Sequence, residues 1–465
     1  MRFASPNERR TISREDVGFY NALVIAAVYE FENDIDIDSP RSFIQPLKEC
    51  IQKYPYLSVV VKDKHTESPA YERVESVNLE NHVSIVHEEA SSEDETAAFE
   101  KILPPILDRP WPADVPPWRI VILPLHDSTV TRCFIAFAFS HTIGDGMVGH
   151  AFHRTFLEAC RQSPTMDEKG SPIITPPIQP LPAPFDTPER LPISWSFLLA
   201  PLIAVYIPKF ISQMIGLRTA ASTVDAGTWT GSRIFFDSTT NSRVKLLEIE
   251  APLVQRALQA SRNHDTKLTA TLHQFIVRAL NKAIPGDDIT HFVSGTAVDM
   301  RGSIGIPADT WGLYVSGHYD VHPRLPDTEP TLSDEMWTAA SSMTRKLAEC
   351  GTRLQDQAIG LLRYLPNFRT WTLGKIGQRR DSSYEVSNLL VFDGGSSEKC
   401  NISKMVFTQP GNVPSAPLVF NVISVKGGSL MCTVSWQAGA LGVPVEEMEL
   451  VDGICASIRA DFQAL

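Results

Sequence analysis

Prolines divide the sequence into two long parts and so limit the folds that it can adopt. Eight of them lie between Ser171 and Pro192, at positions 172, 176, 177, 180, 182, 184, 188 and 192. Because proline lacks a backbone N–H and fixes φ, this density excludes both a regular helix and a central strand. We therefore expect three parts in the 465 residues: an N-terminal half over 1–170, a proline-rich crossover with an apolar segment over 171–224, and a C-terminal half over 225–465.

Each half alternates strand-like and helix-like segments. In the N-terminal half, apolar runs predict strands at Ala22–Tyr29, Leu57–Val61, Trp118–Leu123 and Cys133–Ser140, and helical spacing predicts helices at Arg41–Tyr54 and Met147–Arg161. In the C-terminal half, the same patterns predict strands at Leu246–Ile249, Phe292–Val298, Leu389–Phe392, Val419–Val425 and Ser429–Trp436, and helices at Ala251–Arg262, Thr269–Ala283, Leu332–Glu349 and Val445–Phe462. Both halves are thus predicted to be α/β layers.

Two further segments of the N-terminal half are predicted to lack regular structure. The prolines of Pro104–Pro124 indicate an extended connection that leads into the strand at Trp118. The acidic stretch Glu88–Glu100 is typical of a solvated loop that runs into the start of a helix.

The composition excludes several classes of function. Forty-two basic residues against fifty-four acidic ones give a formal charge of -12, which argues against a protein that binds nucleic acid. The seven cysteines form no Cys-x-x-Cys pair, so we expect neither a zinc knuckle nor a disulfide framework. The polar start Met1–Arg10 is not followed by an apolar signal segment, so we expect a reduced, cytoplasmic protein.

The most apolar window is Trp195–Leu217. Its most apolar part, Phe197–Ile207, is about half of the roughly 20 residues that cross a bilayer, and Pro201 and Pro208 interrupt or end it. We expect this window either to pack within the protein or to form an interfacial or lid helix with peripheral contact to an intracellular membrane, and not to span it.

The motif with the clearest chemistry is His141-Thr142-Ile143-Gly144-Asp145-Gly146, which lies at the predicted turn from a strand to a helix. A neutral histidine there can take a proton from a hydroxyl or amine and return it to a leaving group. Asp145 could orient the ring or, turned away, hold the turn through an ion pair. Gly144 and Gly146 would let the backbone bend tightly and approach a ligand. By itself the motif also fits a surface turn.

Other chemistries lack their anchors. His141, His150 and His153 could be read as a metal cluster with Asp145, but the last two histidines lie a turn or more along the following helix, so we expect no metal. Gly144, Gly146 and Gly149 match a dinucleotide-binding pattern, yet the acidic residue that should end a second strand is missing. The sequence also lacks the Gly-x-Ser-x-Gly, P-loop and His-Glu-x-x-His motifs.

An ordered set of short motifs surrounds this turn. In chain order they are Tyr20-Asn21-Ala22-Leu23, Lys53-Tyr54-Pro55-Tyr56-Leu57, Pro116-Pro117-Trp118-Arg119, the turn at His141, Ala297-Val298-Asp299-Met300-Arg301 and Val386-Ser387-Asn388-Leu389. With this set the chain resembles, over nearly its whole length, the fungal alcohol O-acetyltransferase family of the CoA-dependent acyltransferase superfamily. That superfamily also contains plant-type acyltransferases and the condensation domains of peptide synthetases.

The resemblance implies a fold and a site. It implies two similar α/β domains of the chloramphenicol acetyltransferase type with a tunnel between them, which an acyl-CoA enters from one side and an acceptor from the other. It implies that His141 is the catalytic base and that Asp145 is structural and pairs with Arg301, beside Gly146. Acetyl-CoA is then a cosubstrate, with no permanently bound cofactor.

Two departures from related patterns are visible. The Ser-Asn-Leu-Gly of the family appears here as Ser387-Asn388-Leu389-Leu390, which makes Ser387 and Asn388 candidates for the tunnel but alters the roof of the site. The plant-type Asp-Phe-Gly-x-Gly is absent, which places the chain away from the plant branch.

An anionic CoA needs local positive charge in an acidic chain. Between Arg345 and Arg380 there are eight basic residues and two acidic ones, so Lys375, Arg379 and Arg380 are candidates for the CoA phosphates or for an acidic carrier protein. A solvated helix face would have the same pattern. We expect a monomeric acyltransferase that acts on a small hydrophobic metabolite. The alternatives are acyl transfer from a carrier protein and a ligand-binding scaffold without transfer chemistry.

Overall fold

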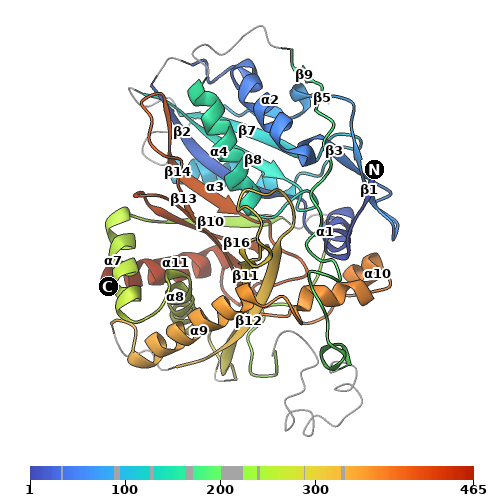
Figure 1. Ribbon diagram of the computed structural model, residues 1–465. Coiled ribbons are helices and arrows are strands. Elements are labelled where there is room, and N and C mark those ends of the chain that lie inside the picture. Colours follow the sequence, from blue (N-terminus) through green and yellow to red (C-terminus); the bar gives the residue numbers. More distant parts are fainter. Residues whose placement is uncertain are drawn as a thin grey trace.

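The computed structural model describes residues 1–32, 35–87, 95–125, 130–162, 171–199, 224–237, 241–286, 288–325 and 330–465 (Figure 1). The N-terminal half has the helices α1 (Pro6–Asp16), α2 (Ile44–Lys53), α3 (Glu95–Asp108) and α4 (Met147–Gln162). Its strands are β1 (Arg2–Phe3), β2 (Leu23–Phe31), β3 (Val59–Lys62), β4 (Ala70–Arg73), β5 (Val77–Asn78), β6 (Val83–Ile85), β7 (Trp118–Leu125), β8 (Thr131–Phe139) and β9 (Ile173–Ile174).

The C-terminal half has the helices α7 (Ala251–Asn263), α8 (Leu268–Ala283), α9 (Asp334–Thr352), α10 (Phe368–Leu373) and α11 (Glu447–Ala464). Its strands are β10 (Ser242–Ile249), β11 (His291–Asp299), β12 (Val315–Pro323), β13 (Tyr384–Phe392), β14 (Cys400–Thr408), β15 (Leu418–Val425) and β16 (Leu430–Gln437). Short 3-10 turns lie at Pro40–Phe43, Pro55–Ser58, Leu79–Asn81, Gly302–Ile304 and Ala358–Tyr364.

Two large sheets organise the described residues. The first has the strand order β14-β2-β8-β7-β6 and the second the order β10-β16-β15-β13-β11-β12. The predicted strand at Cys133 is β8, and it is central in the first sheet, with antiparallel neighbours on both sides that pair Leu23 and Trp118 with Phe139. Its burial on both faces explains why its sequence is continuously apolar. The predicted α/β class is therefore confirmed.

Helices cover each sheet through apolar faces. On the first sheet, α4 lies beside α2, and the ring of its Phe152 stacks on Phe137 of β8 at 3.8 Å between centroids (Figure 1). On the second sheet, α8 packs against both α9 and α11, where the rings of Phe275 and Phe462 are 5.0 Å apart. Each half thus has its own hydrophobic core.

One strand crosses between the halves. The sequence division at residue 225 assigns β14 to the C-terminal half, yet β14 pairs antiparallel with β2, from Cys400 opposite Phe31 to Thr408 opposite Val24. The alternation in this segment gave no strand prediction. The boundary of the sheets therefore differs from the boundary drawn in the sequence, because β14 completes the first sheet after the chain has built most of the second.

The predicted extended connection at Pro104–Pro124 is wrong at its start. Helix α3 continues through Pro104 and Pro105 to Asp108. Each proline removes a helix hydrogen bond. The helix persists because Leu103 and Leu107 on the same element are completely buried, which offsets the lost bonds.

The proline-rich part of the crossover, Ser171–Pro192, has neither a regular helix nor a central strand, as predicted. Its short strand β9 pairs with β5, and the chain then passes α1 (Figure 1). Most of the apolar window Trp195–Leu217 lies outside the described residues, and Trp195 itself is 77% exposed. Among the helices that the structure describes, none combines the length and the apolar character needed to cross a membrane.

Candidate active site

The turn that carries His141 joins the end of β8 to the start of α4 and is held from several sides. The Tyr71 hydroxyl donates to the Thr142 carbonyl at 2.6 Å, and the Trp311 indole donates to the Ile143 carbonyl at 2.7 Å. Ser140 Oγ accepts from the Thr142 N–H at 3.0 Å. Because its carbonyls are bonded to large buried side chains, the turn is a rigid support for the histidine.

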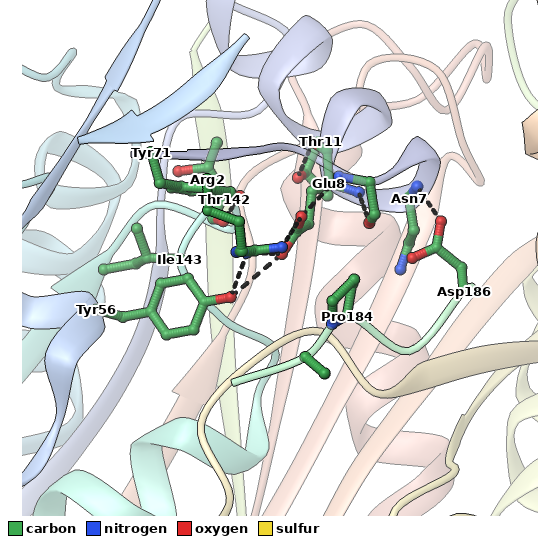
Figure 2. Close-up of polar contacts among 12 residues, drawn as sticks. Arg2, Asn7, Glu8, Thr11, Tyr56, Tyr71, Thr142, Ile143, Pro184 and Asp186 are labelled. Atoms are coloured by element: carbon green, nitrogen blue, oxygen red, sulfur yellow. Dashed lines mark hydrogen bonds and ion pairs between the residues drawn. The ribbon is translucent and has the colours of Figure 1, made fainter. Parts of the chain in front are cut away.

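A second layer of polar contacts fixes the first turn of α1 beside this support. Figure 2 shows Arg2 between Tyr56 and Glu8, with Arg2 Nη2 at 2.8 Å from the Tyr56 hydroxyl and 2.6 Å from Glu8 Oε1. Glu8 also completes a capping box with Ser5, the N-cap of α1. In the same view Asp186 accepts from the Asn7 N–H at 2.7 Å, which ties the crossover to the helix.

The hydrogen bonding of His141 defines its tautomer. Nδ1 lies 2.9 Å from the Gly144 carbonyl oxygen, which can only accept, so Nδ1 carries the proton and Nε2 has the free lone pair. No hydrogen bond from another described residue to Nε2 is present. Burial, together with the positive charge of Arg10, lowers the pKa of His141 to about 4. The ring is therefore neutral near pH 7 and can accept a proton.

A cavity of about 330 Å³ opens onto His141. Both halves of the chain line it, because Arg14 and Tyr20 come from the N-terminal half while Thr296 of β11 and His318 of β12 come from the C-terminal half. The Tyr20 hydroxyl donates to Gln409 Oε1 at 2.7 Å, and the rings of Tyr20 and His141 lie 5.5 Å apart. A histidine at a cavity between two sheets can act on molecules that enter between the halves.

Asp145 points away from the His141 ring. Its Oδ1 lies 2.9 Å from Nη2 of Arg301, the partner that the resemblance implies, and its Oδ2 accepts from the Tyr314 N–H at 2.8 Å. Arg301 also donates to the Thr310 carbonyl and to Asp299 Oδ1. This ion pair therefore connects the turn that carries His141 to the loop that follows β11.

The glycines of the motif are required by packing and not by their backbone angles. A Cβ on Gly146 would approach Leu389 Cδ2 to 2.5 Å, and one on Gly149 would approach Ile25 Cγ1 to 2.4 Å. Neither glycine, nor Gly144, has a positive φ. In place of the expected tight bend, the structure has a close approach of Gly146 to β13 and of Gly149 in α4 to β2.

The two tunnel candidates have different surroundings. Ser387 lines the cavity. Asn388 instead donates to Thr269 Oγ1 at 3.0 Å and accepts from the Leu390 N–H at 2.8 Å, within a register shift of β13 against β15. Leu390, where the family pattern has glycine, adopts φ of 64°, a left-handed conformation that disfavours leucine.

The three candidates for the CoA phosphates are also separated by the structure. Lys375 lines the cavity, with its Nζ 2.9 Å from Asp381 Oδ2. Each guanidinium nitrogen of Arg379 donates to the segment of residues 225–230. Arg380 is 1% exposed and donates to the carbonyls of Val413 and Ser415. The expectation for Arg380 is wrong, because it is buried and its donors are occupied by the protein.

The two other histidines near the motif have structural surroundings. His153 is completely buried, with Nδ1 2.9 Å from the Tyr29 hydroxyl and Nε2 2.9 Å from the Ile25 carbonyl. The His150 ring lies edge-on to Phe392 at 5.5 Å. In the part of the chain that the structure describes, no three histidine, cysteine, aspartate or glutamate side chains are grouped as metal ligands.

Several residues that line the cavity were not identified from the sequence. Arg10 and Arg14 come from α1, which the sequence described only as a polar start, and their spacing of four residues on one helix face was the available signal. Ser316 and His318 come from β12, which was not predicted, because its buried, half-buried and exposed residues do not alternate regularly.

Comparisons with known proteins find similar sequences over most of the chain. A family model described as alcohol acetyltransferase matches residues 86–456. A probable alcohol acetyltransferase of Fusarium pseudograminearum is 23% identical over 427 residues, which cover 87% of this chain and 82% of the relative. A probable alcohol acetyltransferase of Aspergillus fumigatus is 20% identical over 454 residues, or 91% and 92% of the two chains.

Solved structures share the fold at low sequence identity. The trichothecene 15-O-acetyltransferase TRI3 from Fusarium sporotrichioides superimposes with a TM-score of 0.65 and 12% identity, over 98% of this chain and 94% of that one. The condensation domain of the Monacolin K polyketide synthase MokA superimposes with a TM-score of 0.56 and 10% identity, over 99% and 97% of the two chains.

Proposed function

The chain belongs to the alcohol acetyltransferase family, and we propose that it moves an acetyl group from acetyl-CoA to a hydroxyl or amine of a small hydrophobic metabolite, with His141 as the general base. The observation that carries this proposal is the state of His141. Its Nδ1 is committed to the Gly144 carbonyl, its Nε2 is free, and the ring is neutral and borders a cavity lined by both halves.

The proposed reaction needs only this histidine as a proton carrier. Nε2 takes the proton of the acceptor hydroxyl while the hydroxyl oxygen attacks the thioester carbonyl carbon. The C–S bond of the resulting tetrahedral species then breaks, and the departing CoA thiolate takes the proton back from Nε2. The products are the acetyl ester and free CoA, and no acyl group is attached to the protein.

Positioning accounts for the absence of a protein nucleophile in this scheme. When donor and acceptor are held together in one cavity, the attack is effectively unimolecular. This positioning lowers the activation free energy by several kcal/mol, and by up to about 11 kcal/mol in well-oriented systems. Asp145 and Arg301 contribute by holding the turn, and neither needs to contact a substrate.

The donor would be free acetyl-CoA, with Lys375 in the cavity lining as a contact for its phosphates. Of the three basic candidates for CoA binding, Lys375 is the one that borders the cavity, where it forms an ion pair with Asp381. A donor attached to a carrier protein would need the same histidine, so the choice of donor is an outcome of the experiment below.

The experiment measures thiol release and product mass. Purified protein is incubated with acetyl-CoA and a pool of alcohols and amines, and we expect acceptor-dependent release of CoA and an acetylated product. A general base contributes about 10² to 10⁴ in rate, so His141→Ala should lose that much of kcat. His150→Ala and His153→Ala are the matched controls and should keep kcat if they remain folded.

Two results would contradict the proposal. Absence of acceptor-dependent thiol release with any thioester would exclude transfer. A rate for His141→Ala within about threefold of the wild type would show that the turn is only structural. Activity with an acetylated carrier protein but not with acetyl-CoA would instead identify the carrier protein as the acyl donor.

A further inference from the structure

Two arginines of α1 face the cavity without a counter-charge. Arg10 and Arg14 lie one helical turn apart, and both line the cavity that contains His141. Among the residues that the structure describes, neither guanidinium has a carboxylate within ion-pair distance, and Nε of each is buried without a hydrogen-bond partner. Like charges at this spacing on a helix repel each other.

Neighbouring arginines on the same segment behave differently. Arg9 Nη2 lies 2.6 Å from Glu67 Oε2, and Arg2 Nη2 lies 2.6 Å from Glu8 Oε1. Neither Arg2 nor Arg9 lines the cavity, and each has a carboxylate partner. Nε of Arg2 and of Arg9 is also buried without a hydrogen-bond partner, so what distinguishes Arg10 and Arg14 is the lack of a carboxylate partner.

The acidic groups of the cavity do not neutralise this pair. Asp381 is bonded to Lys375. Glu385 accepts from Ser415 Oγ at 2.9 Å, and burial raises its pKa, which favours its neutral form. Asp145 also lines the cavity, but Arg301 balances its charge as Lys375 balances that of Asp381. At most one negative charge, on Glu385, therefore remains against the two positive charges of Arg10 and Arg14, which leaves an excess of positive charge.

Two buried arginines without a counter-charge lower the stability of the fold, which indicates a functional role. Burying a cation without a partner is unfavourable, and burial together with the charge of Arg14 lowers the pKa of Arg10 to about 9. Buried groups with perturbed protonation concentrate at functional sites. A bound anion would restore the missing counter-charge, and the planar guanidinium matches a carboxylate through two parallel hydrogen bonds.

The position of the arginines indicates which anion they bind. Both line the same cavity as His141, and their positive charges contribute to the lowered pKa of that histidine. In the proposed ternary complex the thioester of acetyl-CoA lies at His141, and the long pantetheine arm keeps the CoA phosphates away from it. The anion at the arginines must therefore belong to a part of a substrate close to the reacting bond.

We propose that Arg10 and Arg14 bind a carboxylate carried by one of the two substrates, either on the acceptor alcohol or on the acyl group. The reaction in which this carboxylate takes part rests on the proposed function, whereas the binding of the anion does not. A bound carboxylate would also offset the effect of the arginines on His141 and make that histidine a stronger base. Substrate binding and proton transfer would then be coupled through charge.

The first test is direct binding, which requires no catalysis. Calorimetric titration compares para-hydroxymethylbenzoate with its methyl ester as probes. Because a hydrogen bond to a charged group contributes about 1.5 to 3 kcal/mol, we expect the acid to bind about tenfold to a hundredfold more tightly than the ester. Arg10→Gln and Arg14→Gln should each remove most of this preference.

Arg9→Gln is the matched control, since it removes an arginine from the same helix outside the cavity, and its preference should stay that of the wild type. The melting temperature separates binding from folding. Removal of an unpaired buried charge should leave the melting temperature of Arg10→Gln unchanged or raise it, whereas a structural arginine would lower it. Equal binding of acid and ester, no binding of either, or a preference that survives in both variants overturns the proposal.

The second test identifies the source of the carboxylate. Acetyl-CoA is paired with para-hydroxymethylbenzoate, and malonyl-CoA with the neutral ester, in wild type and in both variants. An arginine-dependent rate with the first pair assigns the carboxylate to the acceptor, and with the second pair to the acyl group. If the variants instead raise only the KM of acetyl-CoA, the arginines bind CoA and the proposal is wrong. If no pair is turned over while binding remains arginine-dependent, the anion site stands and the proposed function fails.

Discussion

Replacement of Asp145 by asparagine tests how the two halves hold the turn that carries His141. The carboxylate uses both oxygens: Oδ1 accepts from Arg301 at 2.9 Å and from the Met147 N–H at 3.1 Å, and Oδ2 accepts from the Tyr314 N–H at 2.8 Å. An amide has one oxygen, so in either orientation its NH₂ group faces a donor. The change removes one charge at almost constant size.

The expected magnitude follows from burial. The side chains of Asp145 and Arg301 are 5% and 2% exposed, and loss of one partner of a buried pair costs about 3 to 5 kcal/mol. Arg301 keeps Asp299 at 2.9 Å, and that carboxylate is 40% exposed. We therefore expect Asp145→Asn to lower the free energy of unfolding by about 3 kcal/mol, and Arg301→Ala, which also loses its bonds to Thr310 and Gly312, by about 5 kcal/mol.

The assay is urea denaturation of both single variants and of the double variant, with kcat measured on the same samples. The double variant should lose less than the sum of the two single losses, because each single change already breaks the pair. Both single variants should also lose kcat, since the turn carries His141. Asp299→Asn is the control and should cost less than about 1 kcal/mol, as an exposed partner does. Additive losses, or Asp145→Asn with normal stability, would show that the pair does not hold the turn.

Three further outcomes can be measured. Leu390→Gly should raise the free energy of unfolding by up to about 1 kcal/mol, because the φ of Leu390 is 64° and glycine adopts this conformation without strain. The control Val391→Gly should lower the free energy of unfolding. A lower value for both variants would show that Leu390 is not strained. Burial raises the pKa of Glu15 to about 7, so its contribution to stability is complete below pH 4.5, the ordinary value, and is lost as pH rises through 7. Between pH 4.5 and pH values above 7, the free energy of unfolding of Glu15→Gln, measured by urea titration, should therefore rise by up to about 3 kcal/mol relative to the wild type. A constant difference between the two proteins over this pH range would refute the prediction. Because the pKa of His141 is lowered to about 4, kcat/KM should fall only well below pH 6.5, the ordinary value; a fall centred there would contradict the burial of the ring.

The sequence predicted those elements that local pattern determines. The strand at Cys133 is apolar throughout and the helix after Gly146 has phenylalanines four residues apart, so both were predictable. Helix α3 was missed beyond Pro104 because the rule that proline ends a helix is local, whereas the burial of Leu103 and Leu107 depends on the sheet they pack against. The position of β14 beside β2 could not be predicted from the sequence either, because the two paired strands are separated by most of the chain.

The site was predictable in part for the same reason. His141 and Asp145 lie in one turn, and a motif of six residues identifies them. Arg380 was misplaced because a basic cluster in the sequence does not reveal which of its members is buried. The cavity itself is formed by residues far apart in the chain, so its lining from α1 and β12 required the fold.

Helix α1 shows how such a contribution can be recognised once the fold is known. Its buried positions are almost all polar, namely Asn7, Glu8, Thr11 and Ser13, with Ile12 as the apolar exception. Hydrophobic burial therefore contributes little to its position. Hydrogen bonds hold it instead, through the capping box and through Ser13 to α10. A polar helix fixed by specific bonds, with two unpaired arginines toward His141, is unfavourable for stability alone. Its placement is best explained by what the arginines bind.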